Sequence, residues 1–190
     1  MKHSHIIIVL FAILLILSAD ALALASLITQ GLFYIKDKAG IYSNFNFGDF
    51  FSDCSGPNCT KTKEALCDWS ADVNFFKSTI GNGLLSVASF FLFLNSLFLL
   101  KSTPDFSFFL ALFGSIFIIS GYGSFKIYFK DSDEYSWLEF ASNSHLITWD
   151  FGSNLPIQVL SFVLGILGSV FILMIWRRKV KKSNQRYFKF

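Results

Sequence analysis

Residues 155–176 read LPIQVLSFVLGILGSVFILMIW, and the chain continues directly with RRKVKK at residues 177–182. The first stretch has no charged side chain. As a helix rising about 1.5 Å per residue, it is long enough to cross the roughly 30 Å hydrocarbon core of a bilayer. Lys and Arg beside a span favour the cytoplasmic side. This junction therefore predicts a membrane-spanning helix whose C-terminal end lies in the cytoplasm.

Three further apolar stretches of similar length precede this one. Of the 190 residues, 53% are hydrophobic and only 15% are charged, against about 25% charged in an average soluble domain. We therefore predict an all-α membrane protein with a four-helix transmembrane bundle, forming one domain over residues 1–190. Its spans cover about residues 6–28, 80–100, 106–125 and 155–176, its outer loops residues 29–79 and 126–154, and its cytoplasmic tail residues 177–190.

The basic tail sets the predicted orientation and accounts for the net charge of +3. It contains no acid, and four spans place the N-terminus, with Lys2, in the cytoplasm as well. The tail is also a candidate for contact with anionic lipid, at about 1 kcal/mol per basic residue, whereas nothing supports nucleic-acid binding. The tail residues concerned are Arg177, Arg178, Lys179, Lys181 and Lys182.

The first apolar stretch has an alternative interpretation. Lys2, the apolar run after it, and the small residues Ala21 and Ala23 also fit a secretory signal peptide, which would leave three spans. The apolar character continues to Ile28, however, which favours a retained span.

All three cysteines, Cys54, Cys59 and Cys67, lie in the first outer loop. Their position outside the membrane fits an oxidising compartment, so we expect one disulfide, with all three pairings open. Asn58 begins the sequon Asn-Cys-Thr and is a glycosylation candidate, unless a disulfide or the preceding Gly-Pro turn blocks it. The sequence shows no catalytic constellation, no metal-ligand spacing and no cofactor motif, so we do not expect an enzyme.

Two polar residues lie within predicted spans. Asp20 is the one acid there, and a charge inside a membrane costs roughly 2.5–3.5 kcal/mol on insertion scales. We expect it to face the bundle or a partner, and Ser86 or Ser89 lie at a similar depth and could hydrogen-bond it. Asn95 is predicted to hold helices together. The alternative for Asp20 is a purely structural, protonated or bundle-satisfied residue.

Small residues recur at helical spacing in the fourth span: Ser161, Gly165 and Ser169, with Gly168 beside them. Small side chains let helices in lipid approach closely, so this stripe predicts packing within the bundle, with a dimer interface as the alternative. The glycine pairs at residues 81 and 83 and at residues 121 and 123 are interpreted as flexible helix ends.

The first outer loop carries a motif that resembles the signature of the claudin and peripheral-myelin-protein superfamily. That signature has Gly-Leu-Trp followed closely by a cysteine, then a second cysteine. Here Gly48, Phe51 and Cys54 are similar to it, with Phe51 in the place of the tryptophan and Cys59 or Cys67 as the second cysteine. The glycine is displaced by one residue and a third cysteine is present. The resemblance covers most of the chain in layout but about ten residues in motif.

This resemblance implies a left-handed four-helix bundle capped by a small extracellular antiparallel β-sheet. The residues favour such a sheet independently, because residues 32–35 and 41–51 are rich in aromatic and β-branched side chains around a polar turn. Residues 127–129 give a further indication of extended chain.

The expected function is a structural or interaction role at the plasma membrane, as in adhesion or a barrier. The outer loops would contact a second copy or another membrane protein, with outer tryptophans as anchors. The alternative is an auxiliary subunit of a channel, transporter or receptor, and a membrane enzyme is the least favoured. The ending Phe188-Lys189-Phe190 also fits a PDZ-type scaffold, which binds C-termini by adding a strand.

Overall fold

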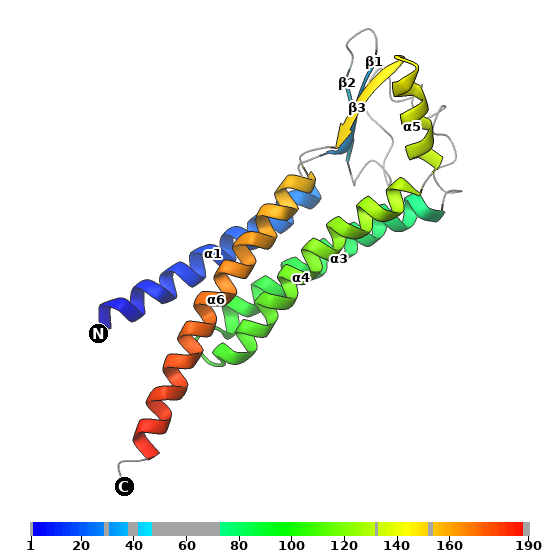
Figure 1. The fold of residues 1–190 in the computed structure, drawn as a ribbon. Helices are drawn as coiled ribbons and strands as arrows, with labels where there is room; N and C mark the ends of the chain where they lie inside the picture. Colours follow the sequence, from blue (N-terminus) through cyan, green and yellow to red (C-terminus); the bar gives the residue numbers. More distant parts are fainter. Residues whose placement is uncertain are drawn as a thin grey trace.

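The computed structural model describes the backbone of residues 2–28, 31–37, 42–46, 73–131, 133–151 and 154–187, with side chains mainly in the long helices. In chain order the elements are α1 (Lys2–Ile28), β1 (Gly31–Asp37), β2 (Tyr42–Asn46), α3 (Val73–Leu99), α4 (Pro104–Lys130), α5 (Asp133–Asn143), β3 (Ile147–Phe151) and α6 (Asn154–Tyr187) (Figure 1).

Four of these helices are long and apolar enough to cross a membrane, as the sequence predicts. The qualifying segments are Ile6–Ser26, Ile80–Leu99, Pro104–Lys130 and Pro156–Lys181. In an apolar 18-residue stretch of each segment, only 28% to 33% of the residues are buried inside the chain. The exposed residues include many large apolar side chains along the helices, such as Leu10, Phe98 and Phe106. Soluble monomers rarely expose continuous apolar surface of this extent, so lipid is the solvent that fits it.

The bundle is built from two helix pairs. In Figure 1, α1 lies along α6 and α3 lies along α4, while α4 and α6 join the pairs. The strands and α5 lie at one end, which we call the strand end. The start of α1, the α3–α4 turn (residues 100–103) and the last turns of α6 lie at the other end, which we call the basic end.

Buried residues recur along each helix in alternating steps of three and four. An average repeat of 3.5 residues is the spacing that gives left-handed packing of helices. The positions that follow this repeat are 12, 16, 19, 23 and 26 in α1; 82, 86, 89, 93, 96 and 100 in the α3 segment; 107, 111, 114, 118, 121 and 125 in α4; and 158, 161, 165, 168, 172 and 175 in α6, and residues 8, 20, 83, 104, 115, 129 and 169 are buried as well.

Serine hydroxyls join α3 to α4. Ser96 and Ser107 each donate to the other's carbonyl oxygen, at 2.8 and 2.7 Å, and Ser89 Oγ donates to the Gly114 carbonyl at 2.7 Å. The tight turn between the helices ends at Pro104, the first residue of α4, where a missing N–H costs nothing. These bonds satisfy hydroxyl groups that would find no hydrogen-bond partner among lipid chains.

Phe93 of α3 fills the space between α4 and α6. The side chain is fully buried. A Cβ added to Gly114 of α4 would lie 3.0 Å from the ring, and one added to Gly165 of α6 would lie 2.7 Å from it. Three helices therefore meet around one ring only because two of them carry glycine there.

The glycine pairs are not at helix ends, so that interpretation was wrong. Helix α3 begins at Val73, which places Gly81 and Gly83 two turns inside it, and α4 runs past Gly123. A Cβ on Gly121 would lie 2.9 Å from Asn82 Oδ1, whereas Gly81 and Gly123 have nothing within 4 Å of such an atom. Helix packing rather than flexibility explains Gly121.

Residues 127–129 are helical, which corrects the prediction of extended chain. No proline or glycine follows Gly123 in α4 to stop the helix. Phe125 and Phe129, one turn apart, stack at 5.2 Å and are both fully buried, and Tyr135 meets Phe129 edge-on at 5.8 Å. These aromatic contacts stabilise the added turn against α5.

Three short strands form an antiparallel sheet in the order β2-β1-β3. Tyr34 of β1 is paired with Asn44 of β2 and with Asp150 of β3. Helix α5 leads into β3 through a left-handed residue, His145 (φ 54°), with Leu146 N–H donating to the Ala141 carbonyl at 3.0 Å. This is the Schellman cap that usually carries glycine.

Adding one methyl group at Gly165 should loosen the bundle. Gly165→Ala forces the Phe93 ring and the Ser115 hydroxyl aside, and overpacking of this kind costs about 1–3 kcal/mol. Thermal unfolding of the full-length protein in mild detergent measures the effect. The matched control is Gly123→Ala, which meets open space and should be neutral or slightly stabilising. Equal behaviour of the two variants would contradict the packing around Phe93.

Candidate functional site

A carboxamide of α6 joins α3 near the strand end of the bundle. Gln158 is 1% exposed, and its Nε2 donates to Asn82 Oδ1 at 2.6 Å and to Ser86 Oγ at 2.9 Å. All three side chains are buried. Gln158 Oε1 is also buried and has no hydrogen-bond partner in the described part of the chain. The cluster therefore keeps one acceptor open.

Asp20 of α1 lies at the same end and is 7% exposed. Beside it, Ser161 Oγ of α6 donates to the Ala19 carbonyl at 2.7 Å, which joins α6 to α1. Asp20 Oδ1 is buried and, among the residues that the structure describes, has no hydrogen-bond partner. The half of the bundle toward the strand end thus contains two open oxygen acceptors, on α1 and on α6.

The predicted hydrogen bond from Ser86 or Ser89 to Asp20 is not formed. Ser86 Oγ accepts from Gln158, and the Ser89 hydroxyl donates its single proton to the Gly114 carbonyl. Ser86 lies where α3 contacts α6, and Ser89 lies where α3 contacts α4. The partners of these serines, the Gly114 carbonyl and the Gln158 carboxamide, are on the helices α4 and α6 that pack against α3 there, whereas Asp20 is on α1.

Asn95 does not join helices within the chain. Its side chain is exposed, and its Nδ2 donates to the Phe91 carbonyl of its own helix at 2.7 Å. A bond to the residue four positions earlier satisfies part of the amide locally. Asn95 therefore lies on the outer surface of α3, where a partner helix could reach it.

The small-residue stripe of α6 lies between helices of the same chain. Ser161 bonds to α1, Gly165 faces Phe93 and Ser115, and a Cβ on Gly168 would lie 2.5 Å from Ile16 Cδ1. Ser169 is buried and donates to the Ile166 carbonyl of its own helix at 2.8 Å. Packing inside the bundle accounts for these four residues without a dimer.

The basic residues lie on the last turns of α6. The side chains of Arg177, Arg178, Lys179 and Lys181 are exposed, while that of Lys182 is outside the described residues. Lys179 Nζ donates to the Ser102 carbonyl in the α3–α4 turn at 2.8 Å. Trp176, one residue earlier, stacks on Phe108 at 6.4 Å, as an interfacial anchor would.

Several predicted site residues lie outside the described residues. They are the signature-like Gly48, Phe51 and Cys54, the other cysteines Cys59 and Cys67, and the sequon residue Asn58. The same holds for the C-terminal residues 188–190.

Gln158 and Asn82, the centre of the buried cluster, were not among the residues predicted from the sequence. Both occupy the same repeating positions as the small residues of α6 and α3. A carboxamide at such a position in an apolar span is a signal for interhelical hydrogen bonding. The cluster can hold helices in register and can accept hydrogen bonds from water or from a partner.

No protein-family model and no curated protein matches this chain.

The Gln158–Asn82 bond should contribute a measurable coupling free energy. We expect a double-mutant cycle with Gln158→Leu and Asn82→Leu, read out by thermal unfolding in mild detergent, to give about 0.5–1.5 kcal/mol. Each single change leaves a buried polar partner unsatisfied. Asn95→Leu is the control, because its amide bonds only to its own helix. A coupling no larger than that between Asn95 and Gln158 would refute the bond.

Proposed function

We propose that this chain is a claudin-like four-span protein of the plasma membrane with a structural or interaction role in adhesion or a barrier. The observation that carries the proposal is the difference between the two ends of the bundle. At the strand end, β1 and β2 come from the segment between α1 and α3, and β3 comes from the segment between α4 and α6. Strand β1 pairs with both β2 and β3. Such a three-stranded cap on four spans is the layout that the superfamily resemblance implies.

The charge distribution supports termini in the cytoplasm. Arg177, Arg178, Lys179 and Lys181 follow the fourth span, and Lys101 lies in the α3–α4 turn at the same end. At the strand end, Lys126 and Lys130 are balanced by Asp131 and Glu139. Basic residues beside spans are retained in the cytoplasm, so the strand end would face outward.

An exposed apolar surface on α5 supports an outer contact. Phe140 of α5 is 68% exposed and Leu146, just after the helix, is 50% exposed, while Leu138 of α5 is fully buried. Helix α5 lies beyond the end of α4 and next to β3 (Figure 1). Exposed aromatic side chains are frequent anchors of protein interfaces. A second copy on a neighbouring cell is the partner that an adhesion role requires.

The alternative function is an auxiliary subunit of a channel, transporter or receptor. Two observations favour it. Asp20 Oδ1 is buried without a partner in the described part of the chain, and Asn95 lies on the exposed face of α3. An amide on the exposed face of a span can contact a partner helix directly, and a buried carboxylate without a partner marks a functional position inside the bundle. A stoichiometric membrane partner that is retained by the wild type and lost with Asn95→Leu would favour this function.

Cell mixing tests the adhesion role. Tagged full-length protein is expressed in non-adherent cells, and its density is compared at contacts between two expressing cells, at contacts with non-expressing cells, and at free surface. We expect enrichment only where both cells express it, and a several-fold smaller enrichment with Phe140→Ser. The matched control is Glu139→Gln on the same helix, which should behave as wild type. Uniform density of the wild type would contradict adhesion and favour the subunit role.

Epitope tags test the orientation. A tag inserted at Ser144, an exposed residue between α5 and β3, should be detected on intact cells. A tag after Phe190 should be detected only after permeabilisation. Asn58→Gln should remove any glycan-dependent mobility shift. Detection of the Ser144 tag only after permeabilisation would reverse the proposed topology.

A further inference from the structure

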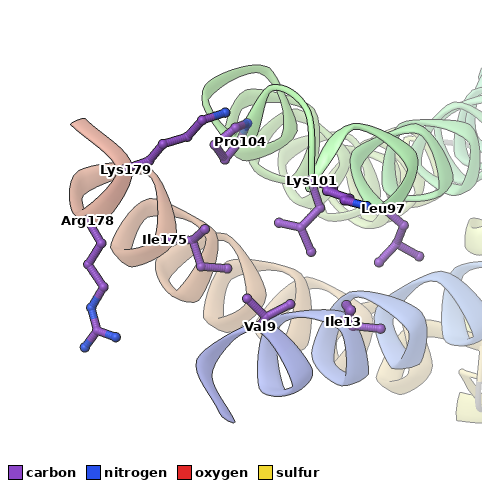
Figure 2. Close-up of a pocket in the computed structure, with 9 residues that line it drawn as sticks. Val9, Ile13, Leu97, Lys101, Pro104, Ile175, Arg178 and Lys179 are labelled. Atoms are coloured by element: carbon purple, nitrogen blue, oxygen red, sulfur yellow. The ribbon is translucent and has the colours of Figure 1, made fainter. Parts of the chain in front are cut away.

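A cavity of about 420 Å³ opens at the basic end of the bundle, where α1, α3, α4 and α6 meet. Its volume lies within the roughly 300–1,000 Å³ of small-molecule sites. Figure 2 shows residues of all four helices around it. The apolar lining consists of Val9, Ile13, Leu97, Leu100, Pro104 and Ile175.

The cavity exists because α1 and α6 separate toward this end. Close packing around Phe93 and the Ser161–Ala19 bond hold the other half together. Toward the basic end, the start of α1 diverges from the last turns of α6 (Figure 1). Ile8 and Ile175 are still buried, but Val9 and Ile13 are only half-buried. The surrounding surface of α1, including Ile6, Ile7 and Leu10, is exposed and apolar, so the cavity opens toward lipid.

Three exposed cations also line the cavity: Lys101, Arg178 and Lys179. Lys179 extends from α6 toward the α3–α4 turn (Figure 2), where its Nζ donates to the Ser102 carbonyl at 2.8 Å. An ammonium has three donors, so two remain for other acceptors. Arg178 extends outward from α6 in the same view.

The charge at this end is strongly positive. Arg177 and Lys181 add to the three lining cations. Among the described side chains at this end, the opposing charge is Asp105, a half-exposed residue in the first turn of α4. Lys101 follows the span Ile80–Leu99, and Lys179 lies in the last turn of the segment Pro156–Lys181, three residues after Trp176. Charged residues at span ends extend to the interface, so both ammonium groups would reach headgroup depth. Leu97 lies within α3, four residues before Lys101, so the apolar lining begins on the bundle side of the α3–α4 turn.

We propose that this cavity binds one anionic phospholipid, with the headgroup phosphate between Lys101 and Lys179 and part of an acyl chain against the apolar lining. Basic pockets between spanning helices bind such headgroups on the cytoplasmic side of membranes, where anionic lipid is concentrated. A partner helix fits less well, because a helix about 10–12 Å wide would place only about one turn in this volume. The proposal holds for either function proposed above.

Native mass spectrometry tests the site with full-length, delipidated protein in mild detergent. Phosphatidylserine and phosphatidylcholine with identical acyl chains are titrated separately. We expect one phosphatidylserine to bind at least tenfold more tightly than phosphatidylcholine. Equal affinity for the two lipids, or self-association of the protein in place of lipid binding, would overturn the proposal.

The charged part of the site is tested with Lys101→Gln/Lys179→Gln. Removing these two positive charges should lower the affinity for phosphatidylserine by about tenfold or more. The matched control is Arg177→Gln/Lys181→Gln, which removes the same charge at the same end without touching the cavity lining. An equal loss in both variants would mean general attraction to a basic surface, and no built site.

The apolar part is tested by filling it. Ile13→Phe places a ring in the cavity and leaves every charge in place, so phosphatidylserine affinity should fall several-fold. Leu10→Phe, on the exposed face of α1 three residues away, is the control and should bind as wild type. Unchanged binding by Ile13→Phe would overturn the acyl-chain half of the proposal. If Ile13→Phe does not fold, Val9→Phe one turn earlier provides the same comparison.

Discussion

The ring of Phe93 lies against two glycines, Gly114 and Gly165, and the rest of the bundle depends on this contact. Lipid chains are as apolar as the helices, so association in a membrane relies on close packing and hydrogen bonds more than on the hydrophobic effect. A Cβ at either glycine would come within about 3.0 Å of the ring. Three helices can therefore approach at this level, and only the glycines allow it.

Close approach at one level brings backbone carbonyls into reach of neighbouring side chains at other levels. The reciprocal Ser96–Ser107 bonds and the Ser161–Ala19 bond each join two helices through a main-chain oxygen. In lipid such hydroxyls have no water to satisfy them, so each bond also removes a desolvation cost. The result is uneven: toward the strand end, α6 bonds to both α1 and α3, whereas among the described residues of the basic end hydrogen bonds join α3 to α4 and α6 to the α3–α4 turn, and none reaches α1.

The sequence predicted the four spans and the packing face of α6, because apolar length and small-residue spacing are local signals. It misplaced Asn95, since hydrophobicity alone does not say which side of an apolar helix faces the bundle. In the repeat of alternating three- and four-residue steps, the buried neighbours of Phe93 are Ser89 and Ser96, and Asn95 lies outside this buried face of α3. Within the helical residues 127–129, Phe129 packs against Phe125 and against Tyr135 of α5, and the β-branched and aromatic composition of the segment could not reveal these contacts. The cavity was also beyond sequence reasoning, because it arises from the divergence of two helices.

The polar cluster and the cavity lie on one helix but act as separate units. Gln158 and Lys179 are 21 residues apart in α6, about 30 Å at the helical rise. Between them lie Gly165 and Gly168, whose close contacts with Phe93, Ser115 and Ile16 fix α6 against three other helices. Packed interfaces of this kind do not deform continuously, and distant sites without shared partners contribute additively to stability. A ligand at the basic end would therefore lower the free energy of the whole bundle without moving the strand end. An outer contact made by α5 and the sheet would then be set by the sequence of those elements, whichever lipid occupies the other end.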